Sequence, residues 1–360
     1  MAKAAAQGAS VELWHLGEYT RELKRRLPRS YFEPVPARAL WILPHLFVIA
    51  GSYWLTLRFD ALLVKAAAAL LTGLSFASLG FLAHEILHGS VVRTPLLRDL
   101  LGGLCFLPFC LGPKLWRKWH NVEHHGHTQH DDDDPDAMGT LEDYRERPSL
   151  QVLYALAPRL RSLLTFAAFT FWFSFHAFEM LRRFAPEFKG RDRLVVWGQF
   201  FGPAAFWCLL LAWLGPVNFA FAYVAPLFIA NFVVMSYIAT NHLLNPLTPV
   251  NDPLANSLTV QTARLLDVLH FNFSHHTEHH LFPAMNPKYA PKVKALVKEL
   301  WPERYNEMSH WKALVVLWRT PRLYRDESNL VDPKRRLVYP VAGRGLDPDR
   351  VQGRPFDADA

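Results

Sequence analysis

Four stretches of the chain are long, apolar and almost free of charged residues. They cover residues 39–57, 61–82, 194–214 and 217–239. Lys65 is the only charged residue within them. Each stretch is close to the ~20 residues that a helix needs to cross a bilayer. Very short turns join the first stretch to the second and the third to the fourth, so the pattern predicts four transmembrane helices arranged as two hairpins.

Two further apolar runs have features that argue against a simple span. Residues 99–111 are too few to cross a bilayer as a straight helix. Residues 162–179 have the length, but they include His176 and Glu179. We expect the run 99–111 to enter the membrane and return, or to lie flat. We expect the run 162–179 to lie along the interface or to pack partly into the membrane without crossing it.

Lys and Arg flank the apolar stretches and thereby indicate the topology. They are frequent in the N-terminal region, between residues 112 and 193, and in the C-terminal third. By the positive-inside rule, both termini and both long polar regions are cytoplasmic. We therefore attribute the net charge of +7 to a multi-pass protein in contact with membrane lipid, and we expect no nucleic-acid partner. The membrane would be the inner membrane of a bacterium or the endoplasmic reticulum of a eukaryote.

This topology divides the chain into three parts. Residues 1–38 form a cytoplasmic N-terminal segment, and residues 39–324 contain the four spans with the polar regions that follow them. Residues 325–360 are polar and dotted with Pro and Gly, so we expect them to form a loose tail. The expected fold is an all-α integral membrane protein in which four transmembrane helices carry a cytoplasmic helical cap.

Histidines are numerous and clustered. Of the 17 His, most lie in or beside three clusters: His84-Glu-Ile-Leu-His88, His120-Asn-Val-Glu-His124-His125 and His276-Thr-Glu-His279-His280. Positions i, i+3 and i+4 share one face of a helix, so the rings within each cluster can converge. Two spans precede the first two clusters and two more precede the third, which brings all three to the same membrane face. Imidazole binds Fe, Cu, Zn or Ni, so the clusters predict a metal centre without naming the metal.

The first cluster admits a second interpretation, because HEILH also matches the HExxH signature of zinc proteases, in which the Glu is the general base. Such a site needs a third ligand, usually acidic, whereas the obvious partners here are six more histidines. Three cysteines without a CxxC pair exclude a disulfide scaffold and a Cys-based zinc site. The acidic run Asp131–Asp134 with Asp136 is expected to be a solvated loop. Of the histidines outside the clusters, four are expected to be structural or surface residues: His15, His45, His176 and His310. Four others lie beside the clusters, and the sequence does not decide whether they are metal ligands: His127, His130, His270 and His275.

The three clusters, in this order, resemble the histidine boxes of the membrane fatty acid desaturase family. The resemblance covers about residues 40–300, and it extends to the contexts WRKWHNVEHHGHTQ and HHTEHHLFP. It implies a non-haem centre of two Fe ions, O2 as co-substrate, and removal of two hydrogens from a fatty acyl chain. Residues 39–324 would then be the desaturase domain. Related proteins with the same boxes hydroxylate, form ketones or decarboxylate free fatty acids to terminal alkenes, so these outcomes stand as alternatives, with the zinc protease as a distant one.

The resemblance also implies roles for individual residues. The expected metal ligands are His84, His88, His120, His124, His125, His242, His276, His279 and His280. His242 is included because family members have an additional metal-binding His between the last span and the third box. Asn241 beside it is expected to hold a metal-bound water or to orient a ligand. The expected partners of the ligands' outer N–H groups are the box carboxylates Glu85, Glu123 and Glu278, which could equally be solvated neighbours.

Neither end of the chain contains a haem-cytochrome domain with its His-Pro-Gly-Gly motif. For a desaturase this implies an external electron donor, either a ferredoxin or a small haem cytochrome with its reductase. The fatty acyl substrate would lie between the apolar helices and the 99–111 run. Its head group, its chain length and the position of the new double bond depend on the shape of that space.

Overall fold

The computed structural model describes residues 12–356, and most of them are helical. Helix α3 (Leu62–Leu87) is central and packs against α2 (Ile42–Arg58), α4 (Pro95–Phe106) and α12 (Ala225–His242). All of its residues from Ser75 to Leu87 are buried, as expected for a helix that is apolar on every side and surrounded by other helices. This burial places the end of α3, with its two histidines, inside the molecule.

A glycine allows α3 and α12 to approach closely. A Cβ atom added at Gly73 would lie 2.7 Å from Cβ of Ile229 and 2.9 Å from the carbonyl oxygen of Pro226. Both of these residues belong to α12. Small residues at helix crossings allow such backbone contact between membrane helices, where packing has to replace the hydrophobic effect.

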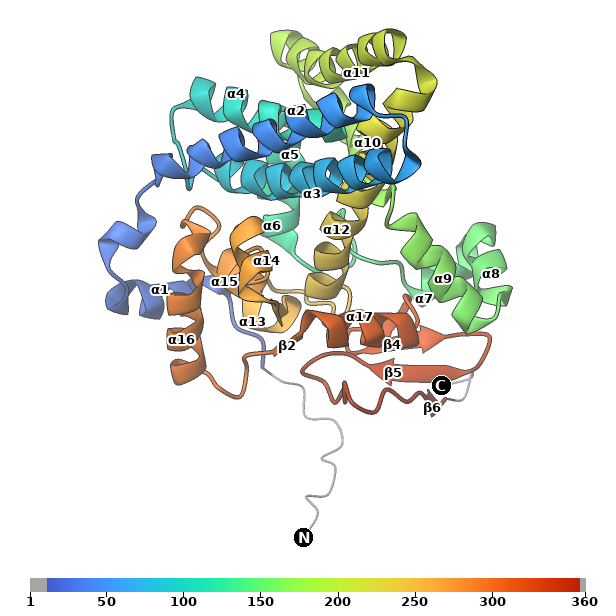
Figure 1. Cartoon of the computed structure of the whole chain (residues 1–360). Helices are drawn as coiled ribbons and strands as arrows, with labels where there is room; N and C mark the ends of the chain where they lie inside the picture. The colour runs from blue at the N-terminus through green and yellow to red at the C-terminus, as the bar shows by residue number, and fades with distance from the viewer. Residues whose placement is uncertain (1–11, 357–360) are drawn as a thin grey trace.

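Within the described part of the chain, three helical segments are long and apolar enough to cross a membrane: Pro36–Arg58, Leu62–Leu87 and Gly190–His242. The third combines α11 (Gly190–Phe219), the π-helix η6 (Ala220–Val224) and α12. Gly215, with φ of 72°, interrupts the helical backbone of α11. The interruption falls at the turn that the sequence predicts between two spans, and Figure 1 shows α11 folding back toward α12 at the top of the molecule. The four-span arrangement stays a prediction.

The two shorter apolar runs are bent. Pro95–Phe109 and Pro113–His127 meet at 97°, and Pro158–Ala168 and Trp172–Glu187 meet at 71°. Each pair is long and apolar enough for a span only when its two halves are taken together, so residues 12–356 contain up to five candidate spans if each pair counts as one. The first pair contains α4, α5 (Pro113–Trp116) and α6 (His125–His127), and the second contains α9 (Pro158–Ala168) and α10 (Trp172–Phe184).

The remaining helices lie on the other side of the molecule from α2 and α11 (Figure 1). They are α1 (Leu16–Arg26), α7 (Leu141–Glu146), α8 (Pro148–Ala155), α13 (Pro253–Asn256), α14 (Arg264–Leu269), α15 (His276–Leu281), α16 (Ala290–Leu300) and α17 (His310–Arg319). A buried apolar cluster that includes Leu23, Leu281 and Val293 joins α1, α15 and α16. Helix α15 is thereby held against α1 and α16.

The C-terminal residues differ from the expected loose tail. They form an antiparallel sheet of β3 (Tyr324–Asp326), β4 (Asn329–Asp332), β5 (Leu337–Pro340) and β6 (Arg354–Pro355), in sequential order. Leu330 and Val331 are buried, and Asp332 forms a buried ion pair of 2.6 Å with Arg161 of α9. A second, parallel pair joins β1 (Thr259–Gln261) to β2 (Glu307–Ser309). These strands are only two to four residues long, too short to produce a clear alternation of apolar and polar residues, and they lie among Pro and Gly residues.

Candidate metal centre

The first histidine cluster is placed by α3. His84 lies in the last turn of the helix and His88 caps it, so the two rings share one face, with centroids 4.7 Å apart. The end of α3 is buried, the His84 ring lines an internal cavity, and Nε2 of His88 is also buried. This is the arrangement expected from the i, i+4 spacing.

The second cluster adopts a π-helix, η4 (Arg117–His124). A π-helix has a wider turn with i→i+5 hydrogen bonds, and such turns are frequent at functional sites. Because of the wider turn, His120 and His125 approach each other, with their Nε2 atoms 3.2 Å apart. His124 lies between them in sequence, and its ring faces His242 and His280, with centroid distances of 4.8 and 5.2 Å.

The third cluster lies on α15, a helix of six residues. His276 and His280, one turn apart, approach His242 at the end of α12. His279 points to the other side, where its Nε2 atom lies 3.1 Å from that of His125. All three clusters therefore meet, although nearly 200 residues separate the first from the third.

The nine rings form two sets. The first set is His84, His88, His120, His125 and His279, whose candidate ligand atoms all lie within 4.8 Å of one another. The second set is His124, His242 and His280, for which the same holds. His276 joins the second set, because its Nε2 atom lies 2.7 Å from that of His242 and 3.1 Å from that of His280.

The spacing of the ring nitrogens fits metal ions. Four of the rings form a chain of contacts, with Nε2–Nε2 distances of 3.1 Å (His84–His120), 3.2 Å (His120–His125) and 3.1 Å (His125–His279). Because a neutral imidazole carries only one N–H, hydrogen bonds alone do not favour so many contacts between the same nitrogens. Nitrogen ligands about 2.1 Å from one ion and at right angles lie about 3.0 Å apart, which is this spacing. Nε2 of His88 is also buried without a hydrogen-bond partner among the described residues.

The outer nitrogens of several rings are bound by oxygen atoms. Nδ1 of His124 lies 2.9 Å from Asp134, Nδ1 of His280 lies 3.2 Å from the Thr128 hydroxyl, and Nδ1 of His242 lies 3.3 Å from the Asn256 carbonyl. An acceptor at Nδ1 fixes the proton there and leaves the Nε2 lone pair directed inward. This tautomer presents the inner nitrogen as a metal ligand.

Burial keeps the rings of α15 neutral. Desolvation, with a smaller contribution from neighbouring His, lowers the pKa of His276, His279 and His280 well below the usual value. A neutral imidazole is the form that binds a metal, so these rings need not lose a proton at neutral pH before they bind one.

Sequence comparison identifies the family. The profile of the fatty acid desaturase family matches residues 60–312, which is more than half of the chain. The chain belongs to the fatty acid desaturase family. Among curated proteins, the chain is 25% identical over 328 residues to an sn-1 oleoyl-lipid 12-desaturase of Picosynechococcus sp., and the match covers 86% of this chain and 91% of that protein.

Two other relatives are also named as desaturases. A chloroplastic omega-6 fatty acid desaturase of Spinacia oleracea is 22% identical over 273 residues, which cover 72% of this chain and 59% of that protein. An sn-1 acyl-lipid omega-3 desaturase (ferredoxin) of Synechocystis sp. is 30% identical over 115 residues, 32% of each chain. The resemblance inferred from the histidine boxes is thus confirmed at the level of the family.

The box carboxylates of this family member contact cations and hydroxyl groups. Glu85 is buried and paired with Arg38, and it accepts a further hydrogen bond from Asn286 at 3.4 Å. Glu123 accepts from Lys118 at 2.5 Å, and Glu278 accepts from Thr259 at 2.8 Å and from Tyr305. The hydrogen bonds of the described residues thus join these three carboxylates to partners other than the nine rings. Because the Glu85 carboxylate is already paired with Arg38, the structure argues against its being the general base of a zinc protease.

Two carboxylates of the acidic run that was expected to be a solvated loop lie beside the centre. Asp134 is buried, and Asp136 accepts hydrogen bonds at 2.8 Å from both Trp119 and His176. Asp136 also lies 3.4 Å from Nδ1 of His124. The expectation of a solvated loop is wrong for these two residues. A loop has no periodicity, so the sequence pattern does not separate them from their exposed neighbours.

The four histidines left open beside the clusters belong to neither set. Nδ1 of His270 lies 2.9 Å from the Tyr237 hydroxyl, and Nδ1 of His275 lies 3.1 Å from that of Ser274. Nδ1 of His127 lies 3.1 Å from the carbonyl oxygen of Glu123, and Nδ1 of His130 accepts the backbone N–H of Asp133 at 3.3 Å. Asn241 is fully buried, and both atoms of its amide lack a hydrogen-bond partner among residues 12–356.

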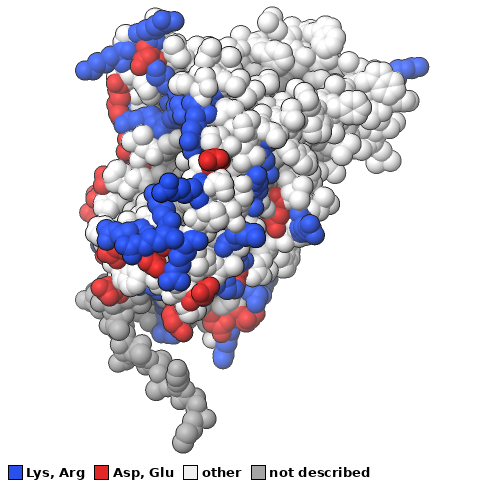
Figure 2. Space-filling view, turned by 90° about the vertical axis from the view of Figure 1, so that its left-hand side faces the viewer, with Lys and Arg blue, Asp and Glu red and all other residues white. Residues whose placement is uncertain are grey.

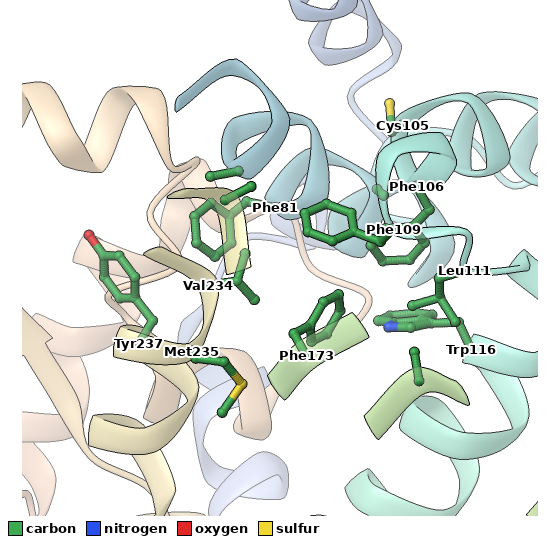
Figure 3. Close-up of a cluster of buried hydrophobic side chains, with 14 of the residues drawn as sticks. Phe81, Cys105, Phe106, Phe109, Leu111, Trp116, Phe173, Val234, Met235 and Tyr237 are labelled. Atoms are coloured by element: carbon green, nitrogen blue, oxygen red, sulfur yellow. The ribbon is translucent and has the colours of Figure 1, made fainter. Parts of the chain in front are cut away.

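An apolar cavity adjoins both imidazole sets. Rings of both sets line it, together with side chains of α4, α5, α10 and α12, among them Phe106, Trp116, Phe173, Val234 and Ile238. Figure 3 shows Phe173 between Val234 and Trp116, beside Phe109. The space between these side chains, counted together with the part that is open to solvent, is about 560 Å³. Gly80 of α3 also lines the cavity, and a Cβ atom added there would lie 3.1 Å from the Phe109 ring.

Proposed function

We propose that this protein is an O2-dependent fatty acyl desaturase that introduces a C=C bond into an acyl chain. The observation that carries the proposal is the position of the two imidazole sets on the wall of a single apolar cavity. In the overall reaction, –CH2–CH2– with O2, two electrons and two protons gives –CH=CH– and two molecules of water. Membership of the family and the acyl-lipid desaturases among the relatives support this reaction.

The nine histidines are proposed to hold two iron ions, five rings at the first and four at the second. When bound, the ions supply the capacity to use O2 for removing hydrogen from an unactivated CH2 group. Asp134 and Thr128 orient His124 and His280 through their outer nitrogens. The amide of Asn241, which has no hydrogen-bond partner among the described residues, is proposed to hold a metal-bound water or to orient a ligand.

The cavity walls hold the substrate and exclude water. Phe106, Trp116 and Phe173 offer rings against which an acyl chain packs without leaving a polar group unsatisfied. An acyl chain in this cavity has its methylene groups beside rings of both sets. Exclusion of water protects the reaction from side reactions with solvent.

The proposed topology has four spans (39–57, 61–82, 194–214 and 217–239) with the imidazole sets and both termini on the cytoplasmic side. In support, α15 and the other polar helices lie together on one side of α2, α3 and α11 (Figure 1). Electrons would come from a ferredoxin or a small haem cytochrome with its reductase. One acyl-lipid relative carries ferredoxin in its name, which favours the first.

Fatty-acid profiling tests the reaction. The chain is expressed in a host without desaturases, and lipids are analysed by gas chromatography with localisation of double bonds. We expect one new unsaturated acyl species, and we expect none with the His120→Ala variant recovered in membranes at the same level. A hydroxylated product, or a terminal alkene one carbon shorter with release of CO2, would replace the desaturase proposal with the corresponding alternative.

A further inference from the structure

One face of the molecule is rich in unpaired cations. It includes α1 and the start of α16, and Figure 2 shows that Lys and Arg predominate there over Asp and Glu. Five exposed residues of this face form no ion pair within residues 12–356: Arg21, Lys24, Arg29, Lys288 and Lys292. We call these five residues the basic face. Glu22, the acidic residue of α1 that forms ion pairs, binds Arg25 and Arg26 instead.

Aromatic rings lie between the cations of the basic face. Tyr31 and Tyr289 stack with centroids 4.1 Å apart, and both are half-buried. The Lys288 ammonium lies 4.7 Å from the Tyr289 ring, and the Lys24 ammonium lies 6.0 Å from the Phe282 ring. Tyrosine rings beside cations are typical of protein interfaces, because they provide contact area with little loss of conformational entropy.

The basic face is close to the first imidazole set. Phe282 follows α15 directly, and its N–H bonds to the carbonyl of His279, a member of that set, at 3.1 Å. A small pocket is lined both by His84 and His279 and by Phe282 and Ala290. The residues from 282 to 289 thus extend from the imidazole set to the basic face. Because electron transfer slows steeply with distance, this is a favourable place for an electron to enter.

The helices of the basic face are built unlike membrane-surface helices. An interfacial helix presents an apolar face to the lipid. In α1 and α16 the apolar residues point into the protein, where Tyr19, Leu23, Val293 and Val297 are buried together. The exposed side of these helices is therefore mainly charged, which suits a protein partner of opposite charge better than an acyl-lipid surface.

We propose that the basic face is the docking surface for an acidic one-electron carrier protein that reduces the metal centre. This inference rests on the proposed function. The reduced carrier gives up one electron at each encounter and leaves oxidised, so two encounters supply the two electrons that the reaction needs. The stacked pair Tyr31–Tyr289 provides the aromatic part of the contact, and the five cations bind acidic groups of the carrier.

Binding of oxidised plant-type ferredoxin tests the surface without relying on turnover. The full chain is placed in nanodiscs of neutral lipid, and ferredoxin is titrated into it at several salt concentrations. The variant Lys24→Glu/Lys288→Glu is compared with Lys334→Glu/Arg335→Glu, which makes the same charge change at exposed positions of the β4–β5 turn. We expect the first variant to weaken binding by about tenfold or more and to reduce its salt dependence, and the second to bind like the wild type.

Turnover separates the docking step from the chemistry. Single turnover of enzyme reduced with dithionite is expected to be equal in all three proteins, whereas ferredoxin-driven turnover is expected to fall in the Lys24→Glu/Lys288→Glu variant. Equal ferredoxin affinity in the two double variants would overturn the proposal. A loss of ferredoxin binding by the Lys24→Glu/Lys288→Glu variant that is seen only in nanodiscs of anionic lipid would also overturn it, because the basic face would then be assigned to lipid. Absence of any turnover in the wild type would refute the proposed function, while the binding result would still decide the docking surface.

Discussion

Replacing Asp134 by Asn is expected to weaken metal binding at the second imidazole set and to leave the first intact. Asp134 is buried, and its carboxylate lies 2.9 Å from Nδ1 of His124 and accepts backbone N–H groups of Gln129 and Asp136 at 2.8 and 3.0 Å. An Asn has the same shape, but only one of its two polar atoms accepts hydrogen bonds. Whichever way the amide is turned, its NH2 group meets at least one of these donors.

The magnitude follows from the number of contacts. One buried donor left unsatisfied costs about 1–3 kcal/mol, and the loss of the negative charge reduces the electron density that His124 offers to a metal. Loss of a carboxylate that orients a ligand typically costs about 10–100-fold in metal affinity, or about 1.4–2.7 kcal/mol. His84 and the other rings of the first set have no contact with Asp134 among the described hydrogen bonds, so their affinity is expected to change little.

Metal content against a chelator series measures the effect. Wild-type enzyme is expected to retain two ions per chain at chelator concentrations where Asp134→Asn retains one. Asp133→Asn is the matched control, because Asp133 is the adjacent carboxylate and is exposed. If Asp134→Asn and Asp133→Asn lose metal together with the wild type, the carboxylate does not support His124 and the account of the second set is wrong.

Three further predictions concern the same centre. His120→Ala and His276→Ala, one from each set, should each abolish product formation in fatty-acid profiling while the protein still inserts, and an active variant would contradict the assignment. Glu85→Gln leaves the Arg38 cation without its buried partner, so the free energy of unfolding should fall by about 3 kcal/mol in thermal unfolding, while product is still formed. Loss of turnover at unchanged stability would instead indicate that Glu85 is a catalytic base. The pKa values of the α15 rings lie well below the usual 6.5, so the unfolded state binds more protons below that pH. As the pH falls below 6.5, each of these three rings should lower the stability of metal-free enzyme by up to about 1.4 kcal/mol per pH unit, or about 4 kcal/mol for all three. Stability that does not change down to pH 5 would refute this.

The sequence predicted the parts of the centre that depend on periodicity. The apolar stretches and the spacing of the box histidines are local patterns, and the structure brings the three clusters together. Contacts made by loops could not be predicted from such local patterns. Asp134 and Asp136 belong to an irregular segment, and Asn286 reaches Glu85 from 201 positions further along the chain. Arg38, which neutralises Glu85, likewise lies in a segment with no pattern that indicates its partner.

The second box shows why its spacing serves two metal sites. In a regular α-helix, successive residues are rotated by about 100°, so His120 and His125 would point about 140° apart. The wider turn of the π-helix η4 reduces this angle, and the two rings meet in the first set with Nε2 atoms 3.2 Å apart. His124 is then left to face the second set, where Asp134 holds its outer nitrogen. One short segment thus links both sets, and a change that restored α-helical geometry here would separate His125 from His120 while all nine histidines were still present.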